Sequence, residues 1–446
     1  GREMTKRERL VMELLKVHAA TFSEQRRAET QVRVTTQLAI SYNNLGDHPK
    51  AVTLLKSNLE KAKANDLSHL FGSIEIGLAR VYRKLNEYPI CRDHAERSLT
   101  DLRANGDWLG MAEAYREIAI SHHQEGSSEK ALEYFDLGIQ IIGERSAPFM
   151  LGKLYTDMSG AYWFLRRPQD GIACLEKSIE FFEQTEHVLN SITAYNNLGI
   201  HLLHIGEWTK AEEIITRALD LAKQTNHAHV AGILDSLGEL KILRGDLPAA
   251  QKLLEEAVKQ ARERKREWYE VQAMRNLSRC LLAEGKYAKA SEKARATIEL
   301  GRQIGAGHYA NMAGVVVAES SLKQGSLAEC ENSLLVVEDN DPSTDFFVLG
   351  NIQRIRGLLS IEAGDNELGV HHFNRALTIF EAAEDVYHTA LVHLLLGQHL
   401  PHRQSVRAAK HLNAALDIFK RLGVEDLKKD AAEALANLAK ASSTEA

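Results

Sequence analysis

Residues Ser191–Leu219 read SITAYNNLGIHLLHIGEWTKAEEIITRAL, which is the pattern of two amphipathic helices joined by a tight turn at Gly206. Apolar residues recur at three- and four-residue spacing on both sides of the turn, as they do on the buried face of a helix. They are Ile192, Tyr195, Leu198 and Leu202 before the turn, and Ile214, Ile215 and Leu219 after it. Neither helix can bury its apolar face alone, so this stretch predicts similar helix pairs on both sides.

The same pattern returns about every forty residues along the chain. The turn position holds Gly in seven of ten copies and Asn in an eighth, as expected where a helix ends in a left-handed conformation. The turn residues are Gly46, Asn86, Gly126, Arg166, Gly206, Gly245, Gly285, Gly325, Gly364 and, less regularly, Arg403. Small residues recur seven positions before and five positions after the turn, for example at Gly199 and Ala211. The sequence therefore predicts a repeat protein of about ten helix pairs.

The turn glycines, the small-residue columns and the apolar columns resemble the tetratricopeptide repeat over nearly the whole chain. The usual period of that family is about 34 residues. The longer period here resembles the subclass of kinesin light chains, Leu-Gly-Asn repeat proteins, Rap regulators and the sensor regions of MalT-type transcription activators. The resemblance implies an all-α fold, a right-handed superhelical solenoid of about ten helix pairs with extra terminal helices.

Five segments follow from the positions of the repeats. An N-terminal helix, Thr5–Phe22, aligns with the second helix of a preceding repeat. The segments are residues 1–24 with this helix, 25–337 with repeats one to eight, 338–347 as an acidic irregular loop, 348–423 with repeats nine and ten, and 424–446 with a capping helix and tail.

Two residues break the pattern near the acidic loop. Glu338 stands in a column that is otherwise apolar, and Arg356 occupies another position that is apolar in the other repeats. Residues Glu338–Phe347 are therefore a break in the solenoid, a loop that contacts another group, or simply a stretched loop between repeats. We expect local mobility and early proteolytic cleavage there.

Composition limits the classes of partner. The net charge is −6 and the isoelectric point about 6.4, so a general attraction to nucleic acid is not expected. No apolar run approaches the ~20 residues of a membrane span. The four cysteines are predicted to be buried reduced thiols, as in an intracellular protein, and we expect a cytoplasmic location.

The sequence lacks the patterns that accompany catalysis. It contains no phosphate-binding GxxxxGK[ST] and no GxGxxG motif. His201 and His204 are three residues apart, without HExxH spacing or a second recognisable ligand pair. We therefore predict a non-enzymatic protein with no cofactor and no metal.

A polar column on the first helix of successive repeats is the candidate binding site. In kinesin light chains and Leu-Gly-Asn proteins the resembling column is largely Asn and hydrogen-bonds the backbone of an extended peptide, and here Asn196, Asn197 and Asn276 keep that residue. The predicted groove residues are Gln37, Arg80, Arg116, Glu117, Asp157, Asn196, Asn197, Asp235, Glu239, Arg275, Asn276 and Arg279. The arginines are expected to select acidic side chains of the partner. Replacing Asn197 and Asn276 with Ala is predicted to weaken binding and to leave folding intact. The alternative is that this column is simply the solvated face of each helix.

The favoured interpretation is a scaffold that binds a peptide or protein segment in a concave groove, as the regulatory or sensor region of an intracellular signalling protein. Two alternatives stay open. One is a small-ligand sensor, as the likeness to MalT-type regulators implies. The other is a structural scaffold for a catalytic domain absent from this chain.

Overall fold

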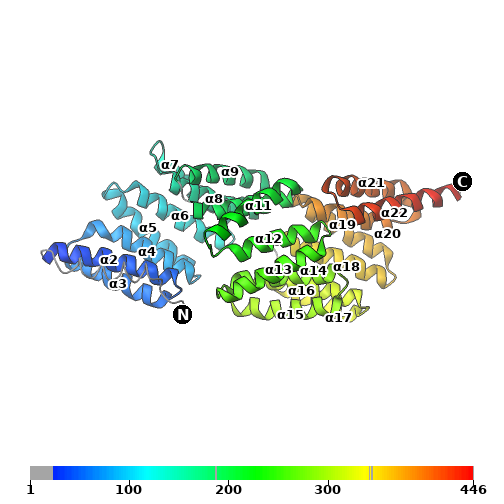
Figure 1. Ribbon diagram of the computed structural model, residues 1–446, viewed down its shortest axis with the longest axis horizontal. Coiled ribbons are helices and arrows are strands. Elements are labelled where there is room, and N and C mark those ends of the chain that lie inside the picture. The colour runs from blue at the N-terminus through cyan, green and yellow to red at the C-terminus, as the bar shows by residue number, and fades with distance from the viewer. Residues whose placement is uncertain (1–23, 186–187, 341, 343–344, 445–446) are drawn as a thin grey trace. The chain divides into compact units, whose positions relative to one another are not determined.

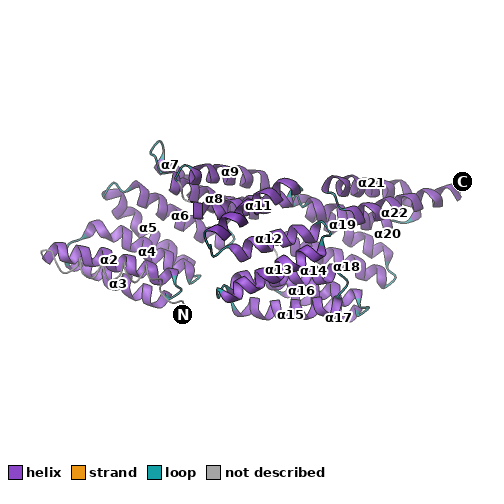
Figure 2. Cartoon of the chain, in the orientation of Figure 1, coloured by secondary structure: helices purple, strands orange, loops and turns teal. Residues whose placement is uncertain are grey.

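The structure, a computed structural model, describes residues 24–185, 188–340, 342 and 345–444. Within these ranges the chain forms 21 α-helices and two short 3₁₀-helices, and no strand (Figures 1 and 2). The predicted all-α repeat fold is therefore confirmed. The predicted helix Thr5–Phe22 lies outside the described residues, as do residues 341, 343 and 344 of the acidic loop. The mobility of that loop stays a prediction.

The helices form ten consecutive pairs followed by one final helix. Each pair consists of a first helix and a second helix joined by a short turn. The first helices are α2 (Glu24–Asn44), α4 (Phe71–Lys84), α6 (Trp108–Gln124), α8 (Pro148–Phe164), α10 (Val188–His204), α12 (Val230–Leu243), α14 (Glu267–Ala283), α16 (Gly307–Lys323), α18 (Phe346–Glu362) and α20 (Val386–His399). The second helices are α3 (His48–Ala64), α5 (Tyr88–Ala104), α7 (Ser128–Ile142), α9 (Pro168–Glu183), α11 (Trp208–Gln224), α13 (Leu247–Glu263), α15 (Tyr287–Gln303), α17 (Leu327–Asp339), α19 (Asn366–Ala382) and α21 (Ser405–Leu422). The 3₁₀-helices are η1 (Ser68–Leu70) and η2 (His402–Gln404), and the final helix is α22 (Glu425–Thr444).

The chain divides into two compact units. The N-terminal unit comprises Gly1–Leu165 and Lys177–Glu186, and the C-terminal unit comprises Arg166–Glu176 and His187–Ala446. Helix α9 contributes to both. The two units are described separately below.

The turn inside each pair explains the recurring glycines. All predicted turn residues except Arg403 have a positive φ, from 56° at Arg166 to 87° at Gly46. Glycine adopts this backbone conformation without the steric cost that a Cβ atom brings. The tenth turn differs from the expected pattern, because α20 is followed by η2 rather than by a single left-handed residue.

Aspartates fix the start of six helices. In each case the side chain accepts a hydrogen bond from the backbone N–H three residues further on, which satisfies a donor that the helix itself leaves unpaired. The capping residues are Asp47, Asp107, Asp246, Asp345, Asp365 and Asp385.

The small-residue columns mark places where the two helices of a pair approach closely. A Cβ atom added to Gly199 would lie 2.1 Å from Cγ1 of Ile215, and one added to Gly357 would lie 2.4 Å from Cε1 of Phe373. Both partner side chains are fully buried. The small residues are therefore required by packing between helices.

The two residues that break the repeat pattern pair with each other. Arg356 on α18 donates from Nε and Nη2 to the two carboxylate oxygens of Glu338 on α17, at 3.2 and 2.8 Å. Arg356 also lies 3.0 Å from Glu331. The loss of the apolar pattern in repeat eight is therefore compensated by an ion pair between adjacent helix pairs.

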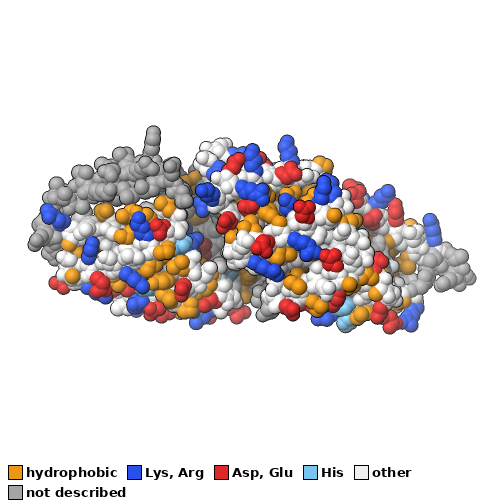
Figure 3. All heavy atoms as spheres, turned by 90° about the horizontal axis from the view of Figure 1, so that it is seen from below, with side chains coloured by type: hydrophobic (Ala, Val, Ile, Leu, Met, Phe, Trp, Pro, Cys, Tyr) orange, Lys and Arg blue, Asp and Glu red, His pale blue; other side chains and the backbone are white. Residues whose placement is uncertain are grey.

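The surface of the protein carries charges of both signs. Lys and Arg side chains are mixed with Asp and Glu side chains over the face drawn in Figure 3, with apolar side chains between them. The four cysteines are buried and unbridged, as predicted. Among the described residues, no helix combines the length and the apolar character that crossing a membrane would require.

Buried His201 is expected to make the stability of the C-terminal unit depend on pH. Its ring lies against Gly171, and burial lowers the pKa of His201 from 6.5 to about 4. Below pH 6.5 the unfolded chain therefore binds a proton that the folded chain resists until about pH 4. We expect this residue to cost up to about 3 kcal/mol of stability as the pH falls through that interval. Urea denaturation at pH 7 and pH 4 should show a smaller pH dependence in His201→Phe than in the unaltered chain.

The control for this prediction is His371→Phe, because His371 is exposed. If His201→Phe and His371→Phe show the same pH dependence as the unaltered chain, buried His201 does not account for the effect.

Candidate functional site

The N-terminal unit carries a hollow of about 510 Å³ on its first helices α2, α4 and α6. Its floor is apolar, with buried Val32, Ile76 and Met150 and the half-exposed Leu109. Its rim is polar, because the exposed side chains of Gln37 and Ser73 stand beside it. The hollow therefore offers apolar contact and hydrogen-bonding groups to the same ligand.

An ion-pair network adjoins the hollow. Glu113, which lines it, lies 2.8 Å from Arg80, 3.0 Å from Lys153 and 3.3 Å from Arg116. Burial opposes the charge of Glu113, but Arg80, Arg116 and Lys153 outweigh it and hold the pKa of that carboxyl at about 2. The ion pairs join the first helices of three successive repeats, α4, α6 and α8.

Glu117 is the buried carboxylate of the same network. It accepts a hydrogen bond from Arg83 at 2.6 Å, and its other oxygen lies 3.6 Å from Arg80 and 3.7 Å from Arg116. Arg116 in turn donates to Asp157 on α8 at 2.5 Å. Such a network positions neighbouring repeats, and its buried charges are stable only while they stay paired.

The predicted groove residues of the N-terminal unit have different environments. Gln37 is exposed and lines the hollow together with Arg80, so these two residues face a space that a ligand can occupy. Arg116, Glu117 and Asp157 belong to the ion-pair network. The expectation that Glu117 projects from its helix into an open groove is wrong, because this residue is 0% exposed.

A second polar network joins α12 to α14 in the C-terminal unit. The amide of Asn276 donates to Asp235 at 2.9 Å, and Arg279 donates to Glu239 at 2.5 Å and to the amide oxygen of Asn276 at 2.8 Å. Arg275 lies 3.5 Å from Glu239. Burial raises the pKa of Asp235 to about 6, while Arg275 and Arg279 hold the pKa of Glu239 well below its usual range despite burial.

Burial corrects the expectation for this second group of predicted groove residues. Asp235, Arg275 and Asn276 are between 0% and 4% exposed. Aromatic rings of later repeats lie against the cations: Tyr309 is 5.8 Å from Arg275 and Phe347 is 5.3 Å from Arg279. Replacing Asn276 with Ala would remove a buried hydrogen-bond partner of Asp235, so we now expect this change to lower the stability of the C-terminal unit.

Asn196 and Asn197 lie on α10 and are half-buried. Both belong to the C-terminal unit, whereas the hollow lined by Gln37 and Arg80 belongs to the N-terminal unit. The twelve predicted residues thus fall into three groups. Two line the hollow, eight belong to the two polar networks, and the remaining two are this Asn pair.

The sequence analysis missed Glu113, Lys153 and Arg83, which complete the first network. Glu113 and Lys153 occupy the same position of successive repeats, forty residues apart, and carry opposite charges. Asn276 and Asp235, and Arg279 and Glu239, are separated by 41 and 40 residues. Polar residues of complementary character spaced one repeat apart were therefore the sequence signal that could have predicted these networks. Within the described part of the chain, no cluster of three His, Cys, Asp or Glu residues is arranged to hold a metal ion.

Two protein-family models match the sequence of the central helix pairs. A tetratricopeptide-repeat model matches residues 151–224, and a second tetratricopeptide-repeat model matches residues 237–303. These two stretches carry tetratricopeptide repeats. The resemblance inferred from the forty-residue pattern is confirmed, and the described helix pairs form a solenoid like those of tetratricopeptide-repeat proteins. No curated protein matches the sequence.

Solved structures with similar folds include two Rap proteins. One is a Rap protein complexed with Competence and Sporulation Factor. Its sequence identity is 15%, the match covers 80% of this chain and 99% of that chain, and the TM-score is 0.59. The other is the Rap conjugation gene regulator of the plasmid pLS20 in complex with the Phr* peptide, with 16% identity, 78% and 96% covered, and a TM-score of 0.55.

A third similar structure is a monomeric mutant of IFIT1 with Gppp-AAAA. Its identity is 13%, 91% of this chain and 90% of that chain are covered, and the TM-score is 0.50. At these identities the likeness concerns the fold.

Proposed function

We propose that this chain binds an extended peptide or protein segment in the hollow of its N-terminal unit. The observation that carries the proposal is the combination, on α2, α4 and α6, of an apolar floor with an exposed polar rim. The corresponding polar residues of α12 and α14 are already bonded to each other, and Asp235, Arg275 and Asn276 among them are buried.

The chemistry of the hollow suits a peptide. An extended segment presents backbone N–H and C=O groups that need partners. The Gln37 amide at the rim can donate and accept, and the Ser73 hydroxyl, which donates to the Leu70 carbonyl, can still accept from an N–H group. Its apolar side chains would lie on the floor near Ile76, Leu109 and Met150. One similar structure, the Rap conjugation gene regulator, is a complex with the Phr* peptide, which supports this choice of ligand class.

The hollow favours apolar over acidic side chains of the ligand. The sequence analysis assigned acid selection to Arg80 and Arg116, but these two arginines already contact Glu113, Glu117 and Asp157. A ligand carboxylate would have to displace one of these carboxylates. We therefore assign selectivity to the apolar floor, and we infer a regulatory role for the scaffold in intracellular signalling.

The test uses a randomised peptide display library selected against the full chain. We expect the enriched peptides to carry apolar residues and to lose at least roughly tenfold in affinity for Leu109→Glu, because burying one Leu contributes about 1.5–3 kcal/mol. Gln37→Ala should weaken binding by a smaller factor, since a single neutral hydrogen bond contributes about 0.5–1.5 kcal/mol. Fluorescence anisotropy with labelled enriched peptides measures both changes.

The matched control is Leu335→Glu, because Leu335 on α17 is 44% exposed and Leu109 is 43% exposed. A circular dichroism melt verifies that both variants fold. Equal affinities of Leu109→Glu and the unaltered chain for all enriched peptides would place binding outside the hollow.

A further inference from the structure

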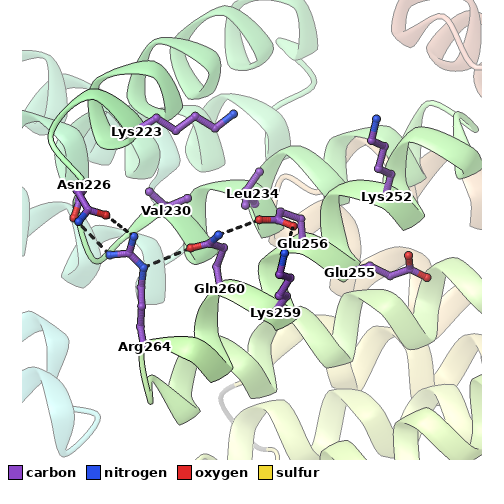
Figure 4. A pocket seen from close by; sticks show the side chains of 10 residues that line it. All are labelled: Lys223, Asn226, Val230, Leu234, Lys252, Glu255, Glu256, Lys259, Gln260 and Arg264. Atoms are coloured by element: carbon purple, nitrogen blue, oxygen red, sulfur yellow. Dashed lines mark hydrogen bonds and ion pairs between the residues drawn. The ribbon is translucent and has the colours of Figure 1, made fainter. Parts of the chain in front are cut away.

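Two neighbouring hollows flank helix α13 in the C-terminal unit. The first, of about 720 Å³, lies between the second helices α11 and α13, and Figure 4 shows it from close by. The other, of about 540 Å³, lies between α13 and α15. Glu255 and Lys259 of α13 line both of them, so the two hollows form one continuous surface, called here the α13 surface.

The α13 surface is basic although the chain is acidic. Its two hollows are lined by eight Lys or Arg residues and three Glu residues, a net charge of +5, whereas the whole chain has a net charge of −6. The next hollow along, between α15 and α17, is lined by two Arg and two Glu residues. The excess of positive charge therefore distinguishes the α13 surface from this neighbouring hollow.

Some cations of the α13 surface are already engaged. Arg264 donates to the side chain of Asn226 at 2.6 Å, Arg262 pairs with Glu270 at 2.6 Å, and Lys286 pairs with Glu284 at 2.9 Å. Figure 4 shows Arg264, Gln260, Glu256 and Lys259 joined in a chain of interactions along one side of the first hollow.

Four lysines of the surface have no ion pair with any residue that the structure describes. They are Lys223, Lys252, Lys289 and Lys293. Lys223 and Lys252 belong to helices on either side of the first hollow, and in Figure 4 both extend without a bonded neighbour. Their ammonium groups are therefore available to carboxylates of a ligand.

The floor under these lysines is apolar. Val230 and Leu234 lie beneath the first hollow, and Val258, Leu277 and Leu281 beneath the second. All five are buried. Three glutamates stand among the lysines, and they would repel a continuous chain of phosphates. A polypeptide can place its carboxylates on the lysines and its backbone N–H groups near the glutamates.

We propose that the α13 surface docks an acidic segment of a partner protein that carries apolar residues between its carboxylates. The carboxylates contact Lys223, Lys252, Lys289 and Lys293, and the apolar side chains cover the floor. This surface is formed largely by second helices of the C-terminal unit, and the peptide hollow by first helices of the N-terminal unit. The chain therefore has two docking sites of different chemistry.

The probe is a fluorescein-labelled peptide of roughly sixteen residues, composed of Glu and Leu, measured by fluorescence anisotropy against the full chain. We expect it to bind, and to bind at least tenfold more weakly at about 300 mM salt than at about 50 mM salt, because exposed charges are screened. Lys223→Glu/Lys252→Glu and Lys289→Glu/Lys293→Glu should each weaken binding at least tenfold.

The control carries the same change in charge elsewhere. Lys61→Glu/Lys420→Glu alters two exposed lysines on α3 and α21 and should change the affinity less than about threefold. An equal loss in this control would overturn the proposal, because the effect would then follow net charge. Absence of peptide binding would overturn it as well.

Two further measurements separate this proposal from its competitors. A labelled oligothymidylate of about the same length should bind more weakly than the acidic peptide, and tighter binding would instead assign the surface to nucleic acid. Leu109→Glu should leave affinity for the Glu/Leu peptide unchanged. A loss there would place the peptide in the hollow of the N-terminal unit and refute docking at α13.

Discussion

Replacing Glu117 with Ala is expected to lower the free energy of unfolding of the N-terminal unit by about 3–5 kcal/mol. The side chain is 0% exposed and holds Arg83 at 2.6 Å, with Arg80 and Arg116 at 3.6 and 3.7 Å. Removing the carboxylate leaves Arg83, which is 19% exposed, without its counter-ion, whereas Arg80 keeps Glu113 and Arg116 keeps Asp157. A buried charge that loses its partner costs far more than an exposed one.

Urea denaturation followed by circular dichroism measures this loss, and hydrogen exchange of the α4 and α6 amides localises it. The control is Glu60→Ala, which removes an exposed carboxylate paired with Lys63 and should cost less than about 1 kcal/mol. Similar losses in Glu117→Ala and Glu60→Ala would show that the network does not hold α4, α6 and α8 together.

Replacing Phe373 with Ala is expected to destabilise the C-terminal unit by about 3–5 kcal/mol. Phe373 on α19 is fully buried, and its ring occupies the space that a Cβ atom on Gly357 would need. It packs in a cluster with Phe380, Val392 and Leu396, which joins two successive helix pairs. Truncation leaves a cavity that these neighbours can fill only in part.

The same urea experiment tests this prediction with Val406→Ala as the control, because Val406 on α21 is 86% exposed and its truncation should cost less than about 0.5 kcal/mol. Protection of the α18 and α20 amides against hydrogen exchange should fall in Phe373→Ala. A loss below about 1 kcal/mol would mean that the ring does not join these two pairs.

Local features of the repeat were predictable from the sequence. The turn positions follow from the glycines at forty-residue steps, and the structure gives nine of the ten a positive φ. The small columns follow from residues such as Gly199, which admits Ile215 of the partner helix. Both depend on residues less than one repeat apart, so a single period in the sequence contains the whole interaction.

Interactions between repeats were harder to predict. In the sequence, Glu338 and Arg356 are two separate departures from the apolar pattern. Only the packing of α17 against α18 shows that they form an ion pair. Glu113 and Lys153 lie forty residues apart in the sequence and 3.0 Å apart in the structure. Polarity indicated that such residues avoid the core of a helix pair, but it did not identify their partners.

The sequence by itself determined that this protein is an all-helical chain of tetratricopeptide-type pairs, because helix periodicity, turn conformation and close approach are set within about forty residues. Only the tertiary structure decided which polar residues of the first helices are available to a ligand. Gln37 remains exposed at a hollow, while Glu117 and Asn276 are completely buried. The physical reason is that their exposure depends on side chains of other repeats, namely the arginines around Glu117 and the acidic residues and arginines around Asn276, which the repeat pattern alone does not place.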